Sequence, residues 1–328
     1  MSRDFADKLA RRQLYSHVPE AEDGTALPDY LTAHFRRFDR AGWIRAIEAG
    51  LVTVNDCPVT PETTLKRHDR VSFWPPETTE PDAKLDFRVV YEDTDLLVID
   101  KPGDLCVHPT GPFFRHTLWH LVGSKYGEIR FVHRLDRETS GLLIAARTRR
   151  AAAAMDNGRT PVRKEYLALG TGDFRGRVHA EGFLVHDNGS AVRKKKRFVF
   201  ANSPEFAEIQ LDPTAETAET ELIEESHVPP DMTLVRAILG TGRQHQVRAT
   251  LYSLGFPLAG DKLYGPDERL FLKIKNQNLT DADRTLLRFR RQALHAAVLE
   301  FRHPFTGDQL RFESPFPWAD FGIASPQS

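Results

Sequence analysis

The spacing of hydrophobic positions changes several times along the chain, and each change predicts a different element. Helical spacing begins at Leu27, and a second helical pattern ends at Gly50, where a C-terminal glycine cap belongs. Residues 51–59 then form two short apolar strands around a turn-prone Asn-Asp pair, and residues 70–74 supply a third strand. The pattern predicts a small unit of two helices, a hairpin and a strand over residues 27–75.

Patterns on either side of this unit set the domain boundaries. Residues 1–26 are polar and weakly patterned, which indicates an N-terminal extension, and residues 76–86 have the proline-rich, acidic composition of a linker. Strand patterns dominate residues 87–328, most densely at 170–235, and residues 267–290 read as a helical insertion. We therefore expect an α+β fold. A large, mainly antiparallel mixed sheet with flanking helices follows the small N-terminal unit.

Composition limits the class of protein. The chain has 328 residues, of which 40% are hydrophobic and 28% charged, enough for one large domain with its own core and a small module. Cys57 and Cys106 show no CxxC spacing, which argues against a disulfide framework and against structural zinc. No apolar run approaches the roughly 18 residues of a membrane span. We expect the protein in the cytoplasm.

Charge is unevenly distributed, although the formal net charge is only −1. A cationic run, Arg193 to Arg197, is offset by an acidic stretch between Glu216 and Glu225. The basic run fits two interpretations equally well, a solvated hairpin edge that discourages strand pairing or a set of phosphate contacts. The near-zero net charge argues against a protein that coats nucleic acid through bulk charge.

The most informative stretch runs from Val132 to Ile144. Asp136 lies between two arginines and just ahead of the turn-forming triplet Thr-Ser-Gly, and the chain then continues as an apolar strand up to Ala146. A loop that ends on a buried strand is rigidly held. The residue types alone leave two interpretations for Asp136, a carboxylate that caps the turn or one that performs chemistry.

Two further stretches decide between these interpretations. Together with Lys164-Glu165-Tyr166-Leu167-Ala168-Leu169 and Thr241-Gly242-Arg243-Gln244-His245-Gln246-Val247-Arg248, in this order, the Asp136 stretch resembles the RluA family of pseudouridine synthases. Lys101-Pro102-Gly103 and the run from Gly255 to Gly265 resemble further blocks of the same family. The resemblance covers about residues 87–318. It implies an enzyme that isomerises uridine to pseudouridine in RNA.

The resemblance also implies roles for particular residues. Asp136 would be the catalytic carboxylate, Arg243 would pair with it, and Tyr166 would stack on the extruded uracil as the candidate base for the proton on carbon five. Arg134 would fill the gap that the flipped nucleotide leaves in the RNA stack. Further RNA contacts are expected within the same blocks, from His133, His245 and Gln246.

The unit at residues 27–75 resembles the α-L RNA-binding module of a small-subunit ribosomal protein, which many members of the family carry at the N-terminus. Basic residues around its two predicted helices would contact RNA phosphates without reading sequence. These residues are Arg36, Arg37, Arg40 and Arg45.

The implied reaction needs no cofactor and no metal, because it only breaks and remakes a bond to the same ribose carbon. One carboxylate suffices, either as nucleophile at the anomeric carbon or as a base that removes the neighbouring ribose proton. A non-catalytic RNA-binding or ribosome-assembly protein is the alternative, and an RNA hydrolase is disfavoured for want of a supporting motif. RNA, ribosomal or transfer, is the expected partner, and a monomer is the default.

Overall fold

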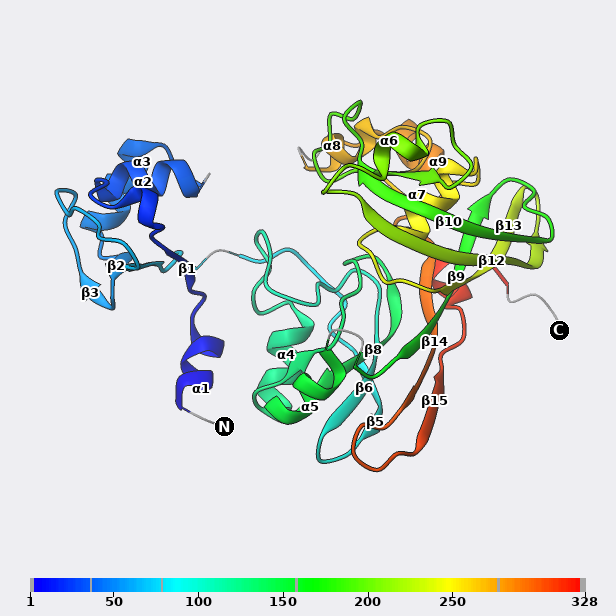
Figure 1. Cartoon of the computed structure of the whole chain (residues 1–328), viewed down its shortest axis with the longest axis horizontal. Helices are drawn as coiled ribbons and strands as arrows, with labels where there is room; N and C mark the ends of the chain where they lie inside the picture. The colour runs from blue at the N-terminus through cyan, green and yellow to red at the C-terminus, as the bar shows by residue number, and fades with distance from the viewer. Residues whose placement is uncertain (1–2, 36, 78, 157–158, 276–277, 325–328) are drawn as a thin grey trace.

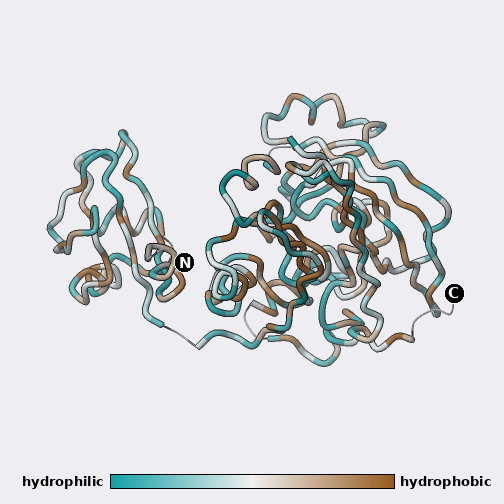
Figure 2. Tube along the Cα trace, turned by 90° about the horizontal axis from the view of Figure 1, so that it is seen from below, coloured by the Kyte–Doolittle hydropathy of each residue, from teal (hydrophilic) through white to brown (hydrophobic). Residues whose placement is uncertain are grey.

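The computed structural model describes residues 3–324 except 36, 78, 157–158 and 276–277. Two bodies are evident in Figure 1, a small N-terminal module and a large domain built on one sheet. Each body buries its own apolar cluster. In Figure 2 the hydrophobic segments accordingly concentrate inside the large domain, with a separate, smaller concentration in the module. None of the described helices is long and apolar enough to cross a membrane.

The N-terminal module has the predicted helices, hairpin and strand, and it begins earlier than predicted. Its elements are β1 (Leu14–His17), η1 (Glu20–Glu22), α2 (Leu27–His34), α3 (Arg40–Glu48), β2 (Val52–Val54), β3 (Cys57–Pro58) and β4 (Arg70–Phe73). The strands form one antiparallel sheet in the order β1-β4-β2-β3. Because β1 pairs with β4 and Val18 lies in the module's core, the predicted boundary at residue 27 is wrong.

The first helix belongs to neither the module nor a loose extension. The helix α1 (Arg3–Ala10) packs on α4 (Leu118–Tyr126) of the large domain, with the rings of Phe5 and Trp119 5.7 Å apart. The His120 ring nitrogen Nε2 lies 3.2 Å from the carbonyl oxygen of Leu9. The predicted linker is also anchored, since the Glu80 carboxylate accepts three backbone N–H groups from residues 114–116. Both connections to the module are therefore fixed on the large domain.

The large domain has the predicted architecture, a mixed sheet with mainly antiparallel pairs. Its strands are β5 (Arg88–Glu92), β6 (Leu96–Lys101), β7 (Arg130–Phe131), β8 (Ser140–Ala146), β9 (Val162–Thr171), β10 (Arg177–His186), β11 (Lys196–Phe200), β12 (Glu216–Val228), β13 (Met232–Leu239), β14 (Leu294–Arg302) and β15 (Gln309–Glu313). Their order is β11-β10-β12-β13-β9-β14-β8-β6-β5, with β15 on β14 and β7 on β8. Among these pairs only β8 with β14 is parallel.

The remaining helices lie around this sheet. They are α5 (Arg149–Met155), α6 (Phe206–Ile209), α7 (Gln246–Ser253), α8 (Arg269–Lys275), α9 (Asp281–Leu287) and the 3-10 helix η3 (Trp318–Phe321). The predicted helical insertion at residues 267–290 corresponds to α8 and α9. Figure 1 shows α6, α7, α8 and α9 together at one end of the domain, above β10 and β12.

The strand β8 is an internal strand of the sheet, and all seven of its residues are buried. It pairs with β6 on one side and with β14 on the other. Gly141 has a φ of +107°, and a Cβ atom there would lie 2.2 Å from the carbonyl oxygen of Ala296. Glycine is therefore required for β8 to approach β14. This close packing fixes the strand that directly follows the loop carrying Asp136.

Candidate active site

Asp136 lies in a tight loop, residues 136–139, in which the carbonyls of residues 136–138 and the Thr139 hydroxyl accept hydrogen bonds from the protein. The loop closes through a hydrogen bond from the Thr139 amide to the carbonyl of Asp136, at 3.2 Å. Side chains from other elements then bind the loop backbone and the Thr139 hydroxyl. These are Lys101 on the carbonyl of Arg137 (3.1 Å), Arg291 on that of Glu138 (3.0 Å) and Gln292 on the hydroxyl of Thr139 (2.7 Å). The position of the Asp136 carboxylate is thus fixed before any substrate arrives.

The partner of Asp136 is Arg248, on the first turn of α7. Its Nη1 donates to Asp136 Oδ2 at 2.7 Å, while Nε and Nη2 donate to the two oxygens of Asp261 at 2.7 and 2.9 Å. Asp261 is fully buried and also accepts the backbone N–H groups of Leu263 and Tyr264. The guanidinium is therefore held in one orientation by Asp261 and directs its third nitrogen, Nη1, at Asp136.

This arrangement keeps Asp136 ionised. Burial alone would raise the pKa of Asp136, but the charge of Arg248, with smaller effects from His245 and Gln292, lowers it to about 2. Burial lowers the pKa of Arg248, and the two carboxylates more than reverse this, so the guanidinium stays charged. The Asp136 side chain is 31% exposed to solvent, whereas the whole Arg248 residue is only 7% exposed. A fixed, ionised carboxylate is thus presented to the outside by a buried cation.

His245 and Gln292 flank the same carboxylate. The His245 Nε2 atom lies 3.8 Å from Asp136 Oδ1, and the Gln292 Nε2 atom lies 3.4 Å from Oδ2. Burial, followed by the charge of Arg248, lowers the pKa of His245 to about 4, so this imidazole is neutral at pH 7. Its Nδ1 is 3.1 Å from the Tyr264 hydroxyl, which fixes the ring. His245 thus adds a neutral polar group to the site.

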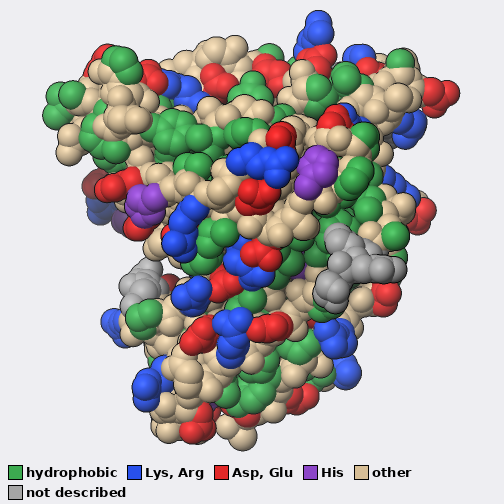
Figure 3. Space-filling view, turned by 90° about the vertical axis from the view of Figure 1, so that its right-hand side faces the viewer, with side chains coloured by type: hydrophobic (Ala, Val, Ile, Leu, Met, Phe, Trp, Pro, Cys, Tyr) green, Lys and Arg blue, Asp and Glu red, His purple; other side chains and the backbone are tan. Residues whose placement is uncertain are grey.

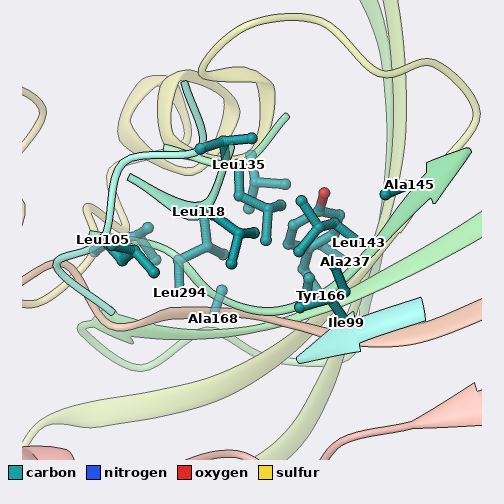
Figure 4. Packing of buried hydrophobic residues seen from close by; sticks show 14 of the residues in the cluster. Ile99, Leu105, Leu118, Leu135, Leu143, Ala145, Tyr166, Ala168, Ala237 and Leu294 are labelled. Atoms are coloured by element: carbon teal, nitrogen blue, oxygen red, sulfur yellow. The ribbon is translucent and has the colours of Figure 1, made fainter. Parts of the chain in front are cut away.

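Tyr166 lies on β9, buried among apolar side chains. Figure 4 shows its ring close to Leu143 and Ala237, with the hydroxyl oxygen drawn in red. No described residue forms a hydrogen bond with this hydroxyl. Burial, and then the negative charge of Asp136, raise the pKa of Tyr166 above its ordinary value, so the phenol is protonated at neutral pH. The Tyr166 hydroxyl can therefore form a hydrogen bond with a bound ligand.

The predicted pairing of Arg243 with Asp136 is wrong. Arg243 is exposed, precedes α7 and donates through Nε to the carbonyl of Thr217 at 3.0 Å. Arg248 occupies the expected place instead. No local pattern marks Arg248 as the partner, because its burial depends on the carboxylate of Asp261, 13 residues further along the chain.

The other predicted RNA contacts of the large domain lie in different environments. Arg134 is exposed, and no described residue forms an ion pair with it. His133 accepts weakly from the Ile144 amide, and burial lowers its pKa to about 3, which leaves it uncharged. Gln246 is 2% exposed, and its amide is fully occupied by Thr241, Arg243, Glu219 and Thr220. Gln246 therefore supports the loop before α7 and is not available to RNA.

The basic residues of the N-terminal module are on its surface. Arg37 and Arg45 are exposed, and the Arg37 guanidinium lies 5.5 Å from the Phe38 ring centroid. Arg40 is also exposed but pairs with Asp29 at 2.6 Å. Arg36 lies outside the described residues. Two of the four predicted cations are thus exposed and free of carboxylates in the part of the module that the structure describes.

The acidic stretch on β12 is largely neutralised by its neighbours. Its five glutamates face Lys196, His179, Arg177, Arg175 and Arg236. On the face shown in Figure 3, side chains of both signs are interspersed. The acidic stretch therefore does not form a repulsive patch that would argue against RNA.

Comparisons with known proteins identify the family of the chain. Residues 95–253 match the family model of RNA pseudouridylate synthase. The chain is 32% identical over 289 residues to an uncharacterized RNA pseudouridine synthase, YlyB, of Bacillus subtilis, covering 83% of this chain and 84% of that protein. It is 31% identical over 318 residues to ribosomal large subunit pseudouridine synthase D of Vibrio parahaemolyticus, covering 93% and 91%.

A solved structure shares the fold. Human RNA pseudouridylate synthase domain containing 1 aligns with a TM-score of 0.54 and 24% identity, over 73% of this chain and 87% of that one. At this level of identity the structural similarity supports a shared fold and nothing more. Taken with the family match and the curated relatives, it leaves one conclusion. The chain belongs to the RluA family of RNA pseudouridine synthases, enzymes that isomerise uridines in RNA to pseudouridine.

Proposed function

We propose that this enzyme modifies particular uridines of large-subunit ribosomal RNA. Relatives named ribosomal large subunit pseudouridine synthase D and C are 31% and 30% identical to it over at least 90% of this chain. The non-catalytic alternative is not favoured, because the Asp136 site is complete and charged. The observation that carries the catalytic assignment is the ionised Asp136 carboxylate, fixed by the 2.7 Å bond from a buried Arg248.

Asp136 supplies the carboxylate for the isomerisation. In one route it attacks the anomeric carbon C1′, the C1′–N1 bond breaks, and the uracil turns over before carbon five bonds to C1′ and releases the carboxylate. In the other route Asp136 takes the proton from C2′ as the C1′–N1 bond breaks, and it returns that proton when C5 bonds to C1′. Both routes end with the C5 proton removed and a proton on N1. Both require the ionised carboxylate that Arg248 maintains.

Tyr166 acts on the base rather than on the sugar. Its ring forms an apolar surface beside Asp136, suited to stacking on a uracil. Because its hydroxyl is protonated and has no partner among the described residues, it can hydrogen-bond the uracil. To take the C5 proton it must pass its own proton on as the new bond forms, since a free phenolate is disfavoured at this buried position.

Arg134 and the N-terminal module act on the surrounding RNA. The target uridine must leave the stack before its ribose can reach Asp136, which costs a few kcal/mol. Arg134, exposed two residues before Asp136, would occupy the gap. Arg37 and Arg45 of the module provide phosphate contacts that hold the RNA without reading its sequence.

Nucleotide-resolution pseudouridine mapping tests the proposal. Ribosomal and transfer RNA would be mapped from cells without the gene, complemented either by the wild type or by Asp136→Asn. Sites in large-subunit ribosomal RNA should disappear on deletion and return only with the wild type. With purified protein, Asp136→Asn should lower the rate by more than about a thousandfold while RNA binding persists. Substantial turnover by Asp136→Asn would refute the role of Asp136, and sites restricted to transfer RNA would refute the substrate.

A further inference from the structure

The basic run at residues 193–197 lies at the end of the hairpin that leads into β11, the edge strand of the sheet. Most of its charge is used within the domain. Three of its five cations form ion pairs, Lys195 with Glu268, Lys196 with Glu216 and Arg197 with Glu205. Arg193 and Lys194 are exposed and have no carboxylate partner among the described residues. The run therefore presents two cations to the outside rather than five.

Lys194 differs from Arg193 because the protein holds its ammonium group in place. The Nζ atom lies 4.2 Å from the ring centroid of Phe271, a cation–π contact. Phe271 belongs to α8 and packs against the cluster that contains Leu263 and Tyr264. The helical insertion thus supplies a fixed support for one exposed cation.

The same hairpin is packed against the active site. The Lys196 amide donates to the Tyr264 hydroxyl at 3.0 Å, and that hydroxyl is 3.1 Å from His245 Nδ1. The His245 ring in turn lies 3.8 Å from Asp136. The charge of Lys194 reaches these groups. It adds to burial and Arg248 in lowering the pKa of His245, and Asp136 in turn opposes the lowering of Lys194's own pKa.

Electrostatic balance explains why a free cation is useful there. The buried triad of Asp136, Arg248 and Asp261 contains two negative charges and one positive charge, a formal net charge of −1. A phosphodiester that brings its ribose to Asp136 carries a further negative charge and is repelled by this excess. A cation beside the triad, unpaired and fixed, offsets the repulsion. An ammonium group suits this task because it binds phosphate as a compact point charge.

We propose that Lys194, supported by the ring of Phe271, binds a backbone phosphate adjacent to the target uridine and so positions the flipped nucleotide over Asp136. The inference rests on the proposed role of Asp136. It assigns the charges of the hairpin to two tasks, internal pairing by Lys195, Lys196 and Arg197 and substrate binding by Lys194. Lys194 acts as a positioning residue, because the reacting atoms belong to the nucleotide that it holds.

Kinetics with a backbone-neutral substrate test this role. The substrate is an RNA stem-loop that the wild type converts, made either with normal phosphodiesters or with neutral methylphosphonates on both sides of the target uridine. On normal RNA, Lys194→Ala should lower kcat/KM about tenfold, mainly by raising KM. On the neutral RNA the wild type should fall to a similar level, and Lys194→Ala should cause no further loss.

Matched variants separate charge from folding. Arg193→Ala removes the adjacent exposed cation and should change kcat/KM less than about twofold, and Lys194→Arg should restore most of the loss. Phe271→Leu keeps the charge but removes its support, so it should fall between the wild type and Lys194→Ala. Equal losses for Lys194→Ala on normal and neutral RNA, or equal losses for Arg193→Ala and Lys194→Ala, would overturn the proposal. Failure of the Asp136 role appears separately, as turnover by Asp136→Asn.

Discussion

The arginine of the active site and the arginines of the N-terminal module are used in opposite ways. Arg248 is 7% exposed, and within the described part of the chain its side chain forms ion pairs with two carboxylates and a cation–π contact with the ring of Tyr264. Arg37 and Arg45 are exposed and free of carboxylates in the described part of the chain. A buried cation of this kind sets the charge and position of another group. The exposed cations can only add affinity, and salt will screen them.

The two regions should respond differently to substitution of their arginines. At Arg248 the number and direction of donors matter, because each nitrogen is assigned to a particular oxygen. At Arg37 and Arg45 the positive charge matters and its geometry matters little. Substitutions that keep charge but change geometry should therefore separate the two regions.

Among the arginines of the two regions, the largest effect is expected from Arg248→Lys. Lysine keeps the charge but cannot bind both oxygens of Asp261 and also reach Asp136, so the carboxylate loses its fixed partner. The rate should fall by about 100-fold to 1000-fold, measured as single-turnover pseudouridine formation. Arg243→Lys is the matched control, because Arg243 is exposed, and its rate should stay within about twofold of the wild type. A severe loss for Arg243→Lys with a mild one for Arg248→Lys would reverse the assignment.

A smaller effect is expected on the free energy of unfolding as the pH is lowered. Burial lowers the pKa of His245 and of His295 to about 4 each, from an ordinary value of 6.5. Below pH 6.5 these histidines are protonated in the unfolded chain but stay neutral in the folded one. The free energy of unfolding therefore decreases as pH falls from 6.5 towards 4. These two histidines contribute about 3 kcal/mol per pH unit inside that window, and His133, whose pKa burial lowers to about 3, adds up to about 1.4 kcal/mol per pH unit more. Urea unfolding at pH 7, 6 and 5 measures it.

A variant assigns this slope to the buried rings. His295 lies between the Ser140 hydroxyl, 2.9 Å away, and the carbonyl of Ser314, 3.1 Å away. His295→Gln keeps a polar group there but removes the titration, so the slope should become shallower by about 1.4 kcal/mol per pH unit, whatever the change in stability at pH 7. An unchanged slope would show that other groups control the acid sensitivity.

Activity should respond to pH differently from stability. The Asp136 pKa of about 2 means that the carboxylate is ionised throughout the neutral and mildly acidic range. Between pH 8 and pH 5.5, at temperatures where the fold is intact, kcat should therefore show no acidic decline from Asp136 or from the neutral His245. Single-turnover rates across that range check this. A decline centred near pH 6.5 would show that His245 titrates in the complex.

Some residues of the active site leave a local signal in the sequence and others do not. The loop of Asp136 was accessible because a turn leading into seven buried residues of β8 leaves a local pattern. The choice between Arg243 and Arg248 was not accessible in this way, because it depends on Asp261, which α7 meets only after folding. Tyr166 was assigned from the family resemblance, since a strand tyrosine alone indicates only core.

The N-terminal boundary was missed for a related reason. The strand β1 has only four residues, alternates between half-buried and exposed positions, and pairs with β4 more than fifty residues later in the chain. The anchoring of the linker through Glu80 is likewise a long-range contact. Local pattern predicted the elements that bury much apolar surface. Short edge strands and single polar anchors depend on partners that are distant in sequence.

The smallest effect is expected at the module. The double substitution of Arg37 and Arg45 by alanine removes two exposed cations, so the plot of log affinity against log salt concentration should lose about 2 units of slope. Arg40→Ala is the control, because its ion pair with Asp29 already consumes much of the charge, and its effect should be smaller. The single-turnover rate on saturating RNA should fall far less than for Arg248→Lys. If the slope stays unchanged, the module arginines do not contact phosphate, and the RNA is held by the large domain alone.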